Sequence, residues 1–131
     1  MEDSIVILVV EDDQGIQQFA EDALSEGGFK VEVASSGDRA IELLEAPDPA
    51  YRALVTDVNL GSDVTTGWDV ARRAREIVPA IPVVYMTGDG AAEWTSKGVP
   101  NSLLLTKPFV PAQLITAVSQ LLNSTATLTE T

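Results

Sequence analysis

The sequence predicts an α/β fold, a five-stranded parallel sheet with helices on both faces. Three observations carry this prediction. Five short apolar runs recur along the chain, and several are apolar throughout, which is typical of strands buried on both faces of a sheet. Segments with helical spacing of apolar residues separate these runs. The chain has 131 residues, the size of one domain with a substantial core.

The predicted strands are the apolar runs themselves. They are rich in leucine and β-branched residues, and turn-forming or polar residues follow most of them. Alternation of such runs with helices favours parallel pairing through right-handed crossovers. The runs are Ile5–Val10, Phe29–Ala34, Ala53–Thr56, Val83–Met86 and Ser102–Leu105.

Five helices are predicted between and after the strands, each from a stripe of apolar residues. Gly27 and Gly28 end the first helix as a C-cap, and Pro79 ends the third. Pro111 suits the first turn of the last helix. We expect one domain over residues 1–123 and a frayed polar tail over 124–131. The helical stripes cover residues 16–24, 40–44, 70–78, 91–94 and 114–122.

Composition and charge exclude several classes of function. The chain has neither cysteine nor histidine, which excludes disulfides, thiolate metal sites, Cys-His or Ser-His catalysis and a phosphohistidine on this chain. It has 20 acidic and 8 basic residues, a net charge of −12. Such a surface repels nucleic acids and anionic membranes. No apolar run is long enough to span a bilayer and no signal peptide opens the sequence, so we expect a cytoplasmic protein.

Polar and charged residues follow four of the five predicted strands. In open α/β sheets, ligands bind at the carboxyl ends of the strands, so these side chains are expected to meet at one edge. They are Glu11, Asp12 and Asp13 after the first strand, Asp57 and Asn59 after the third, Thr87, Gly88 and Asp89 after the fourth, and Thr106 and Lys107 after the fifth.

This combination predicts a site for a phosphoryl group beside a metal ion. Two carboxylates about 4 Å apart repel by roughly 4 kcal/mol at an effective dielectric constant near 20, so a cation should compensate. Oxygen ligands without nitrogen or sulfur favour Mg²⁺ or Mn²⁺. Lys107 adds a fixed positive charge and Thr87 a hydroxyl donor. Asp57, alone at its strand end, is the predicted phosphoryl acceptor, because aspartate can form an acyl phosphate.

Each of these residues has a simpler interpretation when taken alone. The acids that follow the first strand can cap the next helix, and Asp57 can be a turn residue at a strand end. Thr87 and Gly88 can form an ordinary turn, and Lys107 can be a solvated surface residue. Only their joint occurrence at successive strand ends favours a site.

Four motifs resemble those of the receiver domains of two-component response regulators. The resemblance runs from about Ile5 to Asn123. It implies a CheY-like sheet with strand order 2-1-3-4-5, in which the four polar strand ends are neighbours. The motifs are ILVVEDD at 7–13, LVTDVNL at 54–60, VYMTG at 84–88 and LTKPF at 105–109.

The resemblance also implies a role for each matching residue. Asp57 would take a phosphoryl group from a sensor histidine kinase or a histidine phosphotransfer protein. Lys107 would pair with the acyl phosphate and Thr87 would move onto it, while the Lys107–Pro108 bond would be cis. The side chains of Asn59 and Asp89 would tune dephosphorylation. The implied Mg²⁺ ligands are Glu11, Asp12, Asp57 and the backbone carbonyl of Asn59.

Three features depart from the family pattern. Leu104 replaces the usual aromatic residue, which puts the aromatic form of coupling to Thr87 in doubt. The loop 61–67 is longer than usual and has glycine at both ends, and the run Ser102–Leu105 is unusually apolar. Trp94 is interpreted either as half-buried packing or as a partner contact.

Phosphorylation is expected to shift the 89–123 surface for a downstream effector protein or a phosphorelay. We expect a signalling receiver, catalysing only its own phosphorylation and dephosphorylation. It would be a monomer or weak dimer, either a stand-alone protein or a receiver excised from a hybrid kinase.

Three rival functions fit the sequence less well. A haloacid dehalogenase-type phosphatase needs a second aspartate where Asn59 stands, together with a cap and a longer chain. A flavodoxin-like cofactor binder needs a loop rich in Ser, Thr or Gly where the acids of residues 11–13 stand. A degenerate receiver that serves as a scaffold would lack Asp57 or Lys107, and both are present.

Overall fold

The computed structural model describes residues 5–46, 50–60, 64–88 and 91–130, and it confirms the predicted alternation of strands and helices. The elements are β1 (Val6–Val10), α1 (Gln14–Glu26), β2 (Lys30–Ala34), α2 (Gly37–Glu45), β3 (Ala53–Asp57), α3 (Gly67–Ile77), β4 (Val83–Thr87), α4 (Ala91–Lys97), β5 (Ser102–Thr106) and α5 (Pro111–Glu130).

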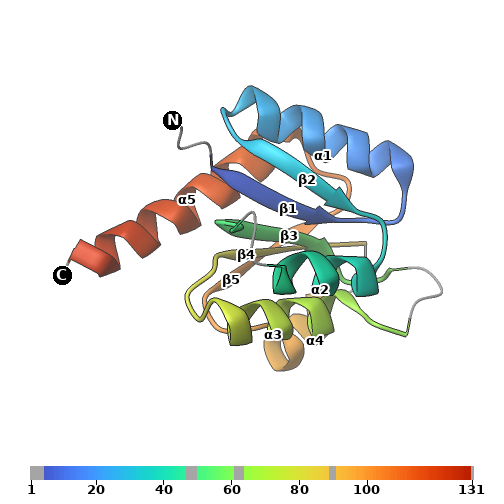
Figure 1. Ribbon diagram of the computed structural model, residues 1–131. Helices are drawn as coiled ribbons and strands as arrows, with labels where there is room; N and C mark the ends of the chain where they lie inside the picture. Colours follow the sequence, from blue (N-terminus) through green and yellow to red (C-terminus); the bar gives the residue numbers. More distant parts are fainter. Residues whose placement is uncertain (1–4, 47–49, 61–63, 89–90, 131) are drawn as a thin grey trace.

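The five strands form one parallel sheet in the order β2-β1-β3-β4-β5, as the resemblance implied (Figure 1). The strand β3 lies at the centre, between β1 and β4. All the strands run in the same direction, so the residues that end β1, β3, β4 and β5 lie at one edge. This topology places the residues of the predicted site together at the carboxyl edge of the sheet.

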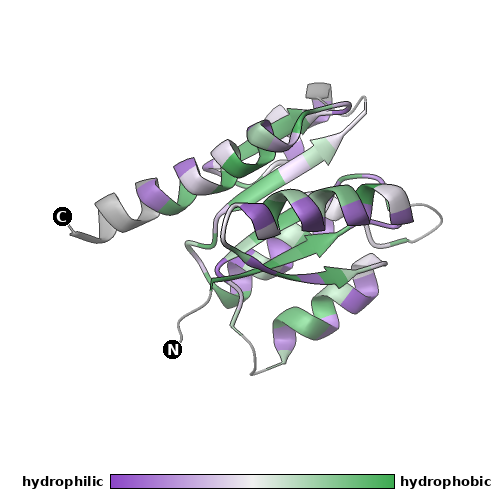
Figure 2. Ribbon diagram, turned by 90° about the horizontal axis from the view of Figure 1, so that it is seen from above, coloured by the Kyte–Doolittle hydropathy of each residue, from purple (hydrophilic) through white to green (hydrophobic). Residues whose placement is uncertain are grey.

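Two apolar clusters lie on opposite faces of the sheet. One cluster joins β-strand residues to α1 and α5, and the other joins them to α2 and α3, with Trp94 of α4 packed against it. Side chains alternate between the two clusters along β4, where Val84 and Met86 face α1 and α5, and Val83 and Tyr85 face the other helices. The strands are apolar along much of their length, whereas hydrophobic and hydrophilic residues alternate along the helices (Figure 2).

Three strands extend one residue beyond the predicted runs. Asp57 ends β3, Thr87 ends β4 and Thr106 ends β5. Backbone pairing continues through these polar residues, since Asp57 is in register with Met86 and Thr87 with Thr106. Asp57 and Thr87 are therefore held by the sheet itself, which fixes them more firmly than a loop would.

The C-terminal segment differs from our expectation of a frayed tail beginning at Ser124. The helix α5 continues to Glu130 and extends past the edge of the sheet (Figure 1). Between Ala112 and Glu130 the chain has no glycine or proline, the residues that most strongly break a helix. No helix in the described part of the chain is long and apolar enough to cross a membrane.

Candidate functional site

The loop that follows β1 bends at Asp12 and is fixed by several hydrogen bonds of Glu11. The Glu11 backbone N–H donates to the carbonyl of Ala34 at 3.0 Å, and the Glu11 carbonyl accepts a bond from Gln17 Nε2 at 2.6 Å. The Glu11 side chain points inward and is buried. Its Oε2 accepts a bond from the Asp13 N–H at 3.1 Å. The direction of the Glu11 carboxylate is therefore set by the backbone on both sides.

Asp57 presents a buried carboxylate at the end of the central strand. The residue is 6% exposed. Its Oδ1 accepts a hydrogen bond from the Asn59 N–H at 3.2 Å, and its Oδ2 accepts one from Lys107 Nζ at 3.1 Å. The next residue is tied to β4, because the Val58 N–H donates to the Met86 carbonyl at 3.1 Å.

Lys107 joins the two buried carboxylates. Its Nζ lies 3.2 Å from Glu11 Oε1 as well as 3.1 Å from Asp57 Oδ2. Its backbone N–H donates to the Thr87 carbonyl at 2.7 Å, which ties the segment after β5 to the end of β4. The Lys107–Pro108 peptide bond is cis, as the resemblance implied.

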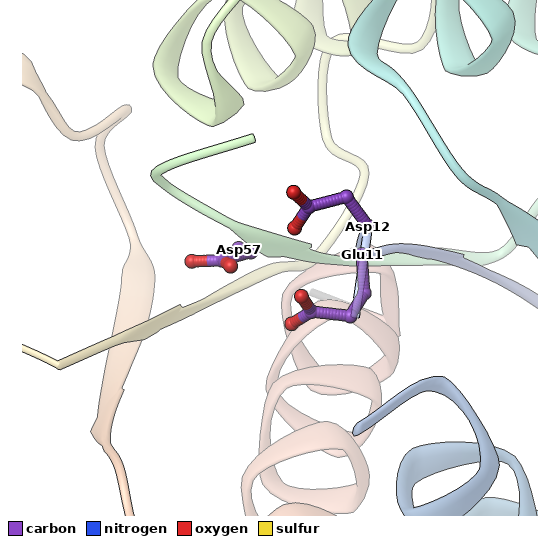
Figure 3. A group of neighbouring side chains, drawn as sticks. All are labelled: Glu11, Asp12 and Asp57. Carbon is purple, nitrogen blue, oxygen red and sulfur yellow. The ribbon is translucent and has the colours of Figure 1, made fainter. Parts of the chain in front are cut away.

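Glu11, Asp12 and Asp57 place their carboxylates around one space (Figure 3). One oxygen from each lies within 4.8 Å of the others. Glu11 and Asp57 are buried and Asp12 is exposed. Three carboxylates with one ammonium group leave an excess of negative charge in a largely desolvated place. Oxygen donors with this charge suit a hard divalent cation, so the residues present fit Mg²⁺.

The raised pKa of Glu11 shows that Lys107 does not fully compensate the negative charge of the buried carboxylates. Burial raises the pKa of Glu11 to about 7, and the Asp57 charge adds to the rise, against the opposing effects of the Asp13 N–H and Lys107. Burial alone would lower the pKa of Lys107, but its hydrogen bond to Asp57 and the charges of Asp57 and Glu11 outweigh burial and raise it. Lys107 therefore stays charged while Glu11 is easily protonated in the absence of another cation.

A cavity of about 720 Å³ opens over these groups. It brings together every predicted metal-binding and phosphoryl-binding residue. Thr106 is exposed and does not line it, and Asp89 and residues 61–63 lie outside the described part of the chain. The lining residues are Glu11, Asp12, Asp13, Ile16, Asp57, Asn59, Thr87, Gly88 and Lys107.

Gln17 was not predicted to take part in the site. Its side chain reaches from α1 back to the carbonyl of Glu11 and also donates to Ser35 Oγ at 3.2 Å. One feature of the sequence could have indicated this role. Gln17 lies in the first turns of α1 and follows Ile16, which belongs to the apolar stripe that faces the sheet. A polar side chain at that position can reach the preceding loop.

Trp94 and Leu104 lie on the side of the sheet that α4 covers. The Trp94 Nε1–H donates to Ser102 Oγ at 2.9 Å, and the ring is partly buried against the apolar cluster. This geometry supports the packing interpretation of Trp94. Leu104 is partly buried in the same cluster, opposite Tyr85 of β4, so a buried aromatic ring lies on the neighbouring strand instead.

Comparisons with known proteins agree on one family. The family model described as the response regulator receiver domain matches residues 7–119. The transcriptional regulatory protein CusR of Escherichia coli is 32% identical over 119 residues, which are 89% of this chain and 51% of CusR. The response regulator receiver protein CpdR of Brucella abortus is 30% identical over 118 residues, covering 88% of this chain and 95% of CpdR.

Solved structures give the same result. The crystal structure of a response regulator receiver protein from Sinorhizobium medicae has a TM-score of 0.89 and 47% sequence identity, covering 93% of this chain and 97% of that one. This chain spans about half the length of CusR, and nearly the full length of CpdR.

Proposed function

Because this chain belongs to the family of response regulator receiver domains, which act in two-component signalling, we propose that Asp57 is its phosphoryl acceptor. The observation that carries the proposal is the position of the Asp57 carboxylate. It ends the central strand, it is buried, and it lies 3.1 Å from Lys107 and beside two further carboxylates. This is a nucleophile held in place by the sheet, beside the ammonium group of Lys107 and within a cluster of carboxylates that suits a divalent cation.

The proposed reaction is transfer of a phosphoryl group from a phosphohistidine. Receiver domains interact with histidine kinases or phosphotransfer proteins, and this chain has no histidine of its own. A carboxylate oxygen of Asp57 forms a bond to phosphorus while the P–N bond to the donor imidazole breaks, and the imidazole leaves with a proton from solvent. The charge at position 57 then becomes more negative, from −1 to about −2 at neutral pH, as for other phosphorylated side chains.

Lys107 and Thr87 are proposed to stabilise the product. Lys107 already bonds both buried carboxylates, so its ammonium group can follow the added charge without entering from solvent. Thr87 ends the neighbouring strand and lines the same cavity, where its hydroxyl can donate to a phosphoryl oxygen.

Mg²⁺ is the proposed cofactor, with Glu11, Asp12, Asp57 and the backbone carbonyl of Asn59 as candidate ligands. When bound, it would neutralise carboxylate and phosphoryl charge. The excess of carboxylates over ammonium groups supports this proposal, because Lys107 alone does not balance them. The Asn59 residue is exposed at the rim of the cavity, where its side chain can influence access of water.

The proposed output is a shift of the 89–123 surface, read by a downstream effector protein or used in a phosphorelay. Lys107 N–H is bonded to the carbonyl of Thr87, so the ends of β4 and β5 are mechanically joined at the site. Movement of Thr87 or Lys107 toward a phosphoryl group would act on the elements that follow each strand. We propose a monomer or weak dimer as the working form.

The test is phosphorylation by acetyl phosphate with Mg²⁺, followed by intact mass. The protein should gain one phosphoryl group, and Asp57→Asn and a chelator should each abolish the gain. Asp22→Asn is the matched control, because Asp22 is exposed on α1, accepts a bond from Gln18 and does not line the cavity, so this variant should keep the gain. A folded wild-type protein that gains no mass from acetyl phosphate or from phosphorylated kinases would favour a scaffold instead.

A further inference from the structure

We propose that Gln17 is a positioning residue that holds the Glu11–Asp12 peptide so that both carboxylates face the cation site. This inference rests on the proposed function, since it concerns the site in which Mg²⁺ would bind. It assigns a role to a residue of α1 that carries no charge and does not line the cavity. Two hydrogen bonds from the one amide group of Gln17 give it this role.

The first bond fixes the peptide between the two acids. Gln17 Nε2 lies 2.6 Å from the carbonyl oxygen of Glu11, which belongs to the peptide joining Glu11 to Asp12. The Glu11 side chain leaves one side of this peptide toward Lys107, and the Asp12 side chain leaves the other side toward the open rim. A rotation of this peptide would therefore move both carboxylates relative to Asp57.

The second bond anchors Gln17 to another strand end. Gln17 Nε2 also lies 3.2 Å from Ser35 Oγ, just after β2. A backbone hydrogen bond also links the loop after β1 to the end of β2, because the Glu11 N–H donates to the carbonyl of Ala34. The loop after β1 is thus tied to β2 on one side and to α1 on the other. The β2 strand, whose end carries no charge, contributes to the site through this link.

The orientation of the Gln17 amide follows from its partners. A carbonyl oxygen only accepts hydrogen bonds, so the amide nitrogen and not the amide oxygen must face Glu11. The two protons of Nε2 then supply one bond each to Glu11 and Ser35. A side chain without donors at position 17 would leave the Glu11 carbonyl without this partner.

Repulsion among the acids is the force that Gln17 opposes. Three carboxylates approach within 4.8 Å, and Lys107 contacts only the two buried ones. The exposed Asp12 has no such restraint from Lys107 and can turn toward water if its backbone relaxes. Groups that orient metal ligands in this way typically account for about 10–100-fold in metal affinity.

The test compares the same substitution at two neighbouring positions. Gln17→Met keeps the size of the side chain and removes its donors. Gln18→Met is the matched control, because Gln18 is exposed on α1 and donates to Asp22 on the same helix, at 2.9 Å. The measurements are the unfolding temperature in EDTA and its rise with Mg²⁺ concentration, which gives an apparent dissociation constant.

Gln17→Met should weaken Mg²⁺ binding by about 10-fold, whereas Gln18→Met should match the wild type. Ser35→Ala should have a smaller effect than Gln17→Met, because the bond to Glu11 remains. A Gln17→Met protein with a lower unfolding temperature in EDTA but wild-type Mg²⁺ affinity would overturn the inference and leave the proposed function standing. A wild-type protein with no Mg²⁺-dependent shift would instead overturn the proposed metal site itself, and this inference with it.

Discussion

Lys107 is the residue on which the charge balance of the site depends. It contacts two buried carboxylates that would otherwise face each other without compensation. Its place in the site was predictable, because a lysine at a strand end beside acidic strand ends supplies positive charge to the carboxylates. The same reasoning identified Asp57, Thr87 and the acids after β1. All of these residues have charged or hydroxyl side chains, whose chemistry can be predicted from the sequence alone.

Replacing Lys107 should destabilise the protein when no metal is present. Lys107→Met leaves Glu11 and Asp57 buried without their shared cation, and we expect a loss of about 1–3 kcal/mol in the free energy of unfolding in EDTA. Mg²⁺ should restore part of it. Denaturant titration measures the change. Lys97→Met, which removes an exposed partner of Glu93, should cost less than about 0.5 kcal/mol, and equal losses in the two variants would contradict the interpretation.

Gln17 shows where prediction at the residue scale stops. Its role depends on the path of the backbone after Glu11, and a glutamine in an amphipathic helix is chemically unremarkable. No property of its residue type indicates a bond to a carbonyl six positions earlier. The path of a loop, unlike the charge of a strand end, is decided by packing among several segments.

At the scale of elements, the start of α3 lies against the end of β3. The Gly67 N–H donates to the Val58 carbonyl at 3.1 Å, and a Cβ placed on Gly67 would lie 2.0 Å from the Asp57 carbonyl oxygen. Only glycine permits this approach without movement. The first residue of one helix therefore helps to set the position of the proposed phosphoryl acceptor.

Gly67→Ala should accordingly affect both stability and phosphorylation. The added methyl group must displace the backbone of Asp57 or the start of α3, with an expected cost of about 1–3 kcal/mol and slower phosphorylation by acetyl phosphate. Thermal unfolding and intact mass measure these two effects. Gly15→Ala is the control, because its Cβ would meet only the end of the Asp13 side chain, at 3.2 Å. A Gly67→Ala protein as stable and as reactive as wild type would show that the contact is unimportant.

The cap of α3 predicts a pH dependence of stability. The Thr66 side chain accepts from the Asp69 N–H, and the Asp69 carboxylate accepts from the Thr66 N–H at 3.0 Å. The backbone bond from Thr66 lowers the pKa of Asp69, despite partial burial. A lowered pKa in the folded state means that the stabilisation is complete above the unfolded-state pKa and is lost as the pH falls through the folded-state value.

Asp69→Asn should therefore destabilise the protein by about 1 kcal/mol at pH 7. The difference from wild type should shrink as the pH falls below about 4. Urea titrations at several pH values measure it. Asp22→Asn removes an exposed carboxylate bonded to Gln18 and should show neither effect. A difference between Asp69→Asn and wild type that stays constant down to acidic pH would contradict the role of the carboxylate.

The limits of element prediction have physical causes. The centres of β1, β3, β4 and β5 were predictable because they are apolar on both faces, and β2 because its valines alternate with polar residues. The last residues of β3, β4 and β5 were missed because they are polar and hydropathy assigns them to loops. The end of α5 was placed too early for the opposite reason. Its last residues are polar, but polarity alone does not end a helix, and this stretch contains neither glycine nor proline, the strongest helix breakers.

At the scale of the whole molecule, alternation predicted a parallel sheet, but it did not determine the strand order. The order came from the resemblance of four strand-end motifs to a known family, and the sheet confirms it. The chain carries a net charge of −12, which favours solubility and opposes compactness through self-repulsion.

Monovalent salt should therefore stabilise the fold. Raising NaCl from low to physiological concentration shortens the Debye length to about 8 Å and screens repulsion among exposed acids. The unfolding temperature should rise by a few degrees in EDTA, before any Mg²⁺ is added. Thermal unfolding at matched pH measures it, and an unfolding temperature that falls with added salt would mean that attractive surface pairs outweigh the repulsion.

The most direct test of the central proposal locates the phosphoryl group. The protein is phosphorylated with acetyl phosphate and Mg²⁺ and treated with borohydride, which reduces an acyl phosphate and converts that aspartate to homoserine. Tandem mass spectrometry of the peptides should find homoserine at position 57 and at no other acid, with none in the chelated sample. Homoserine at Asp12 or Asp13 with an unmodified Asp57 would contradict the assignment of the acceptor, and with it the proposed roles of Lys107 and Thr87.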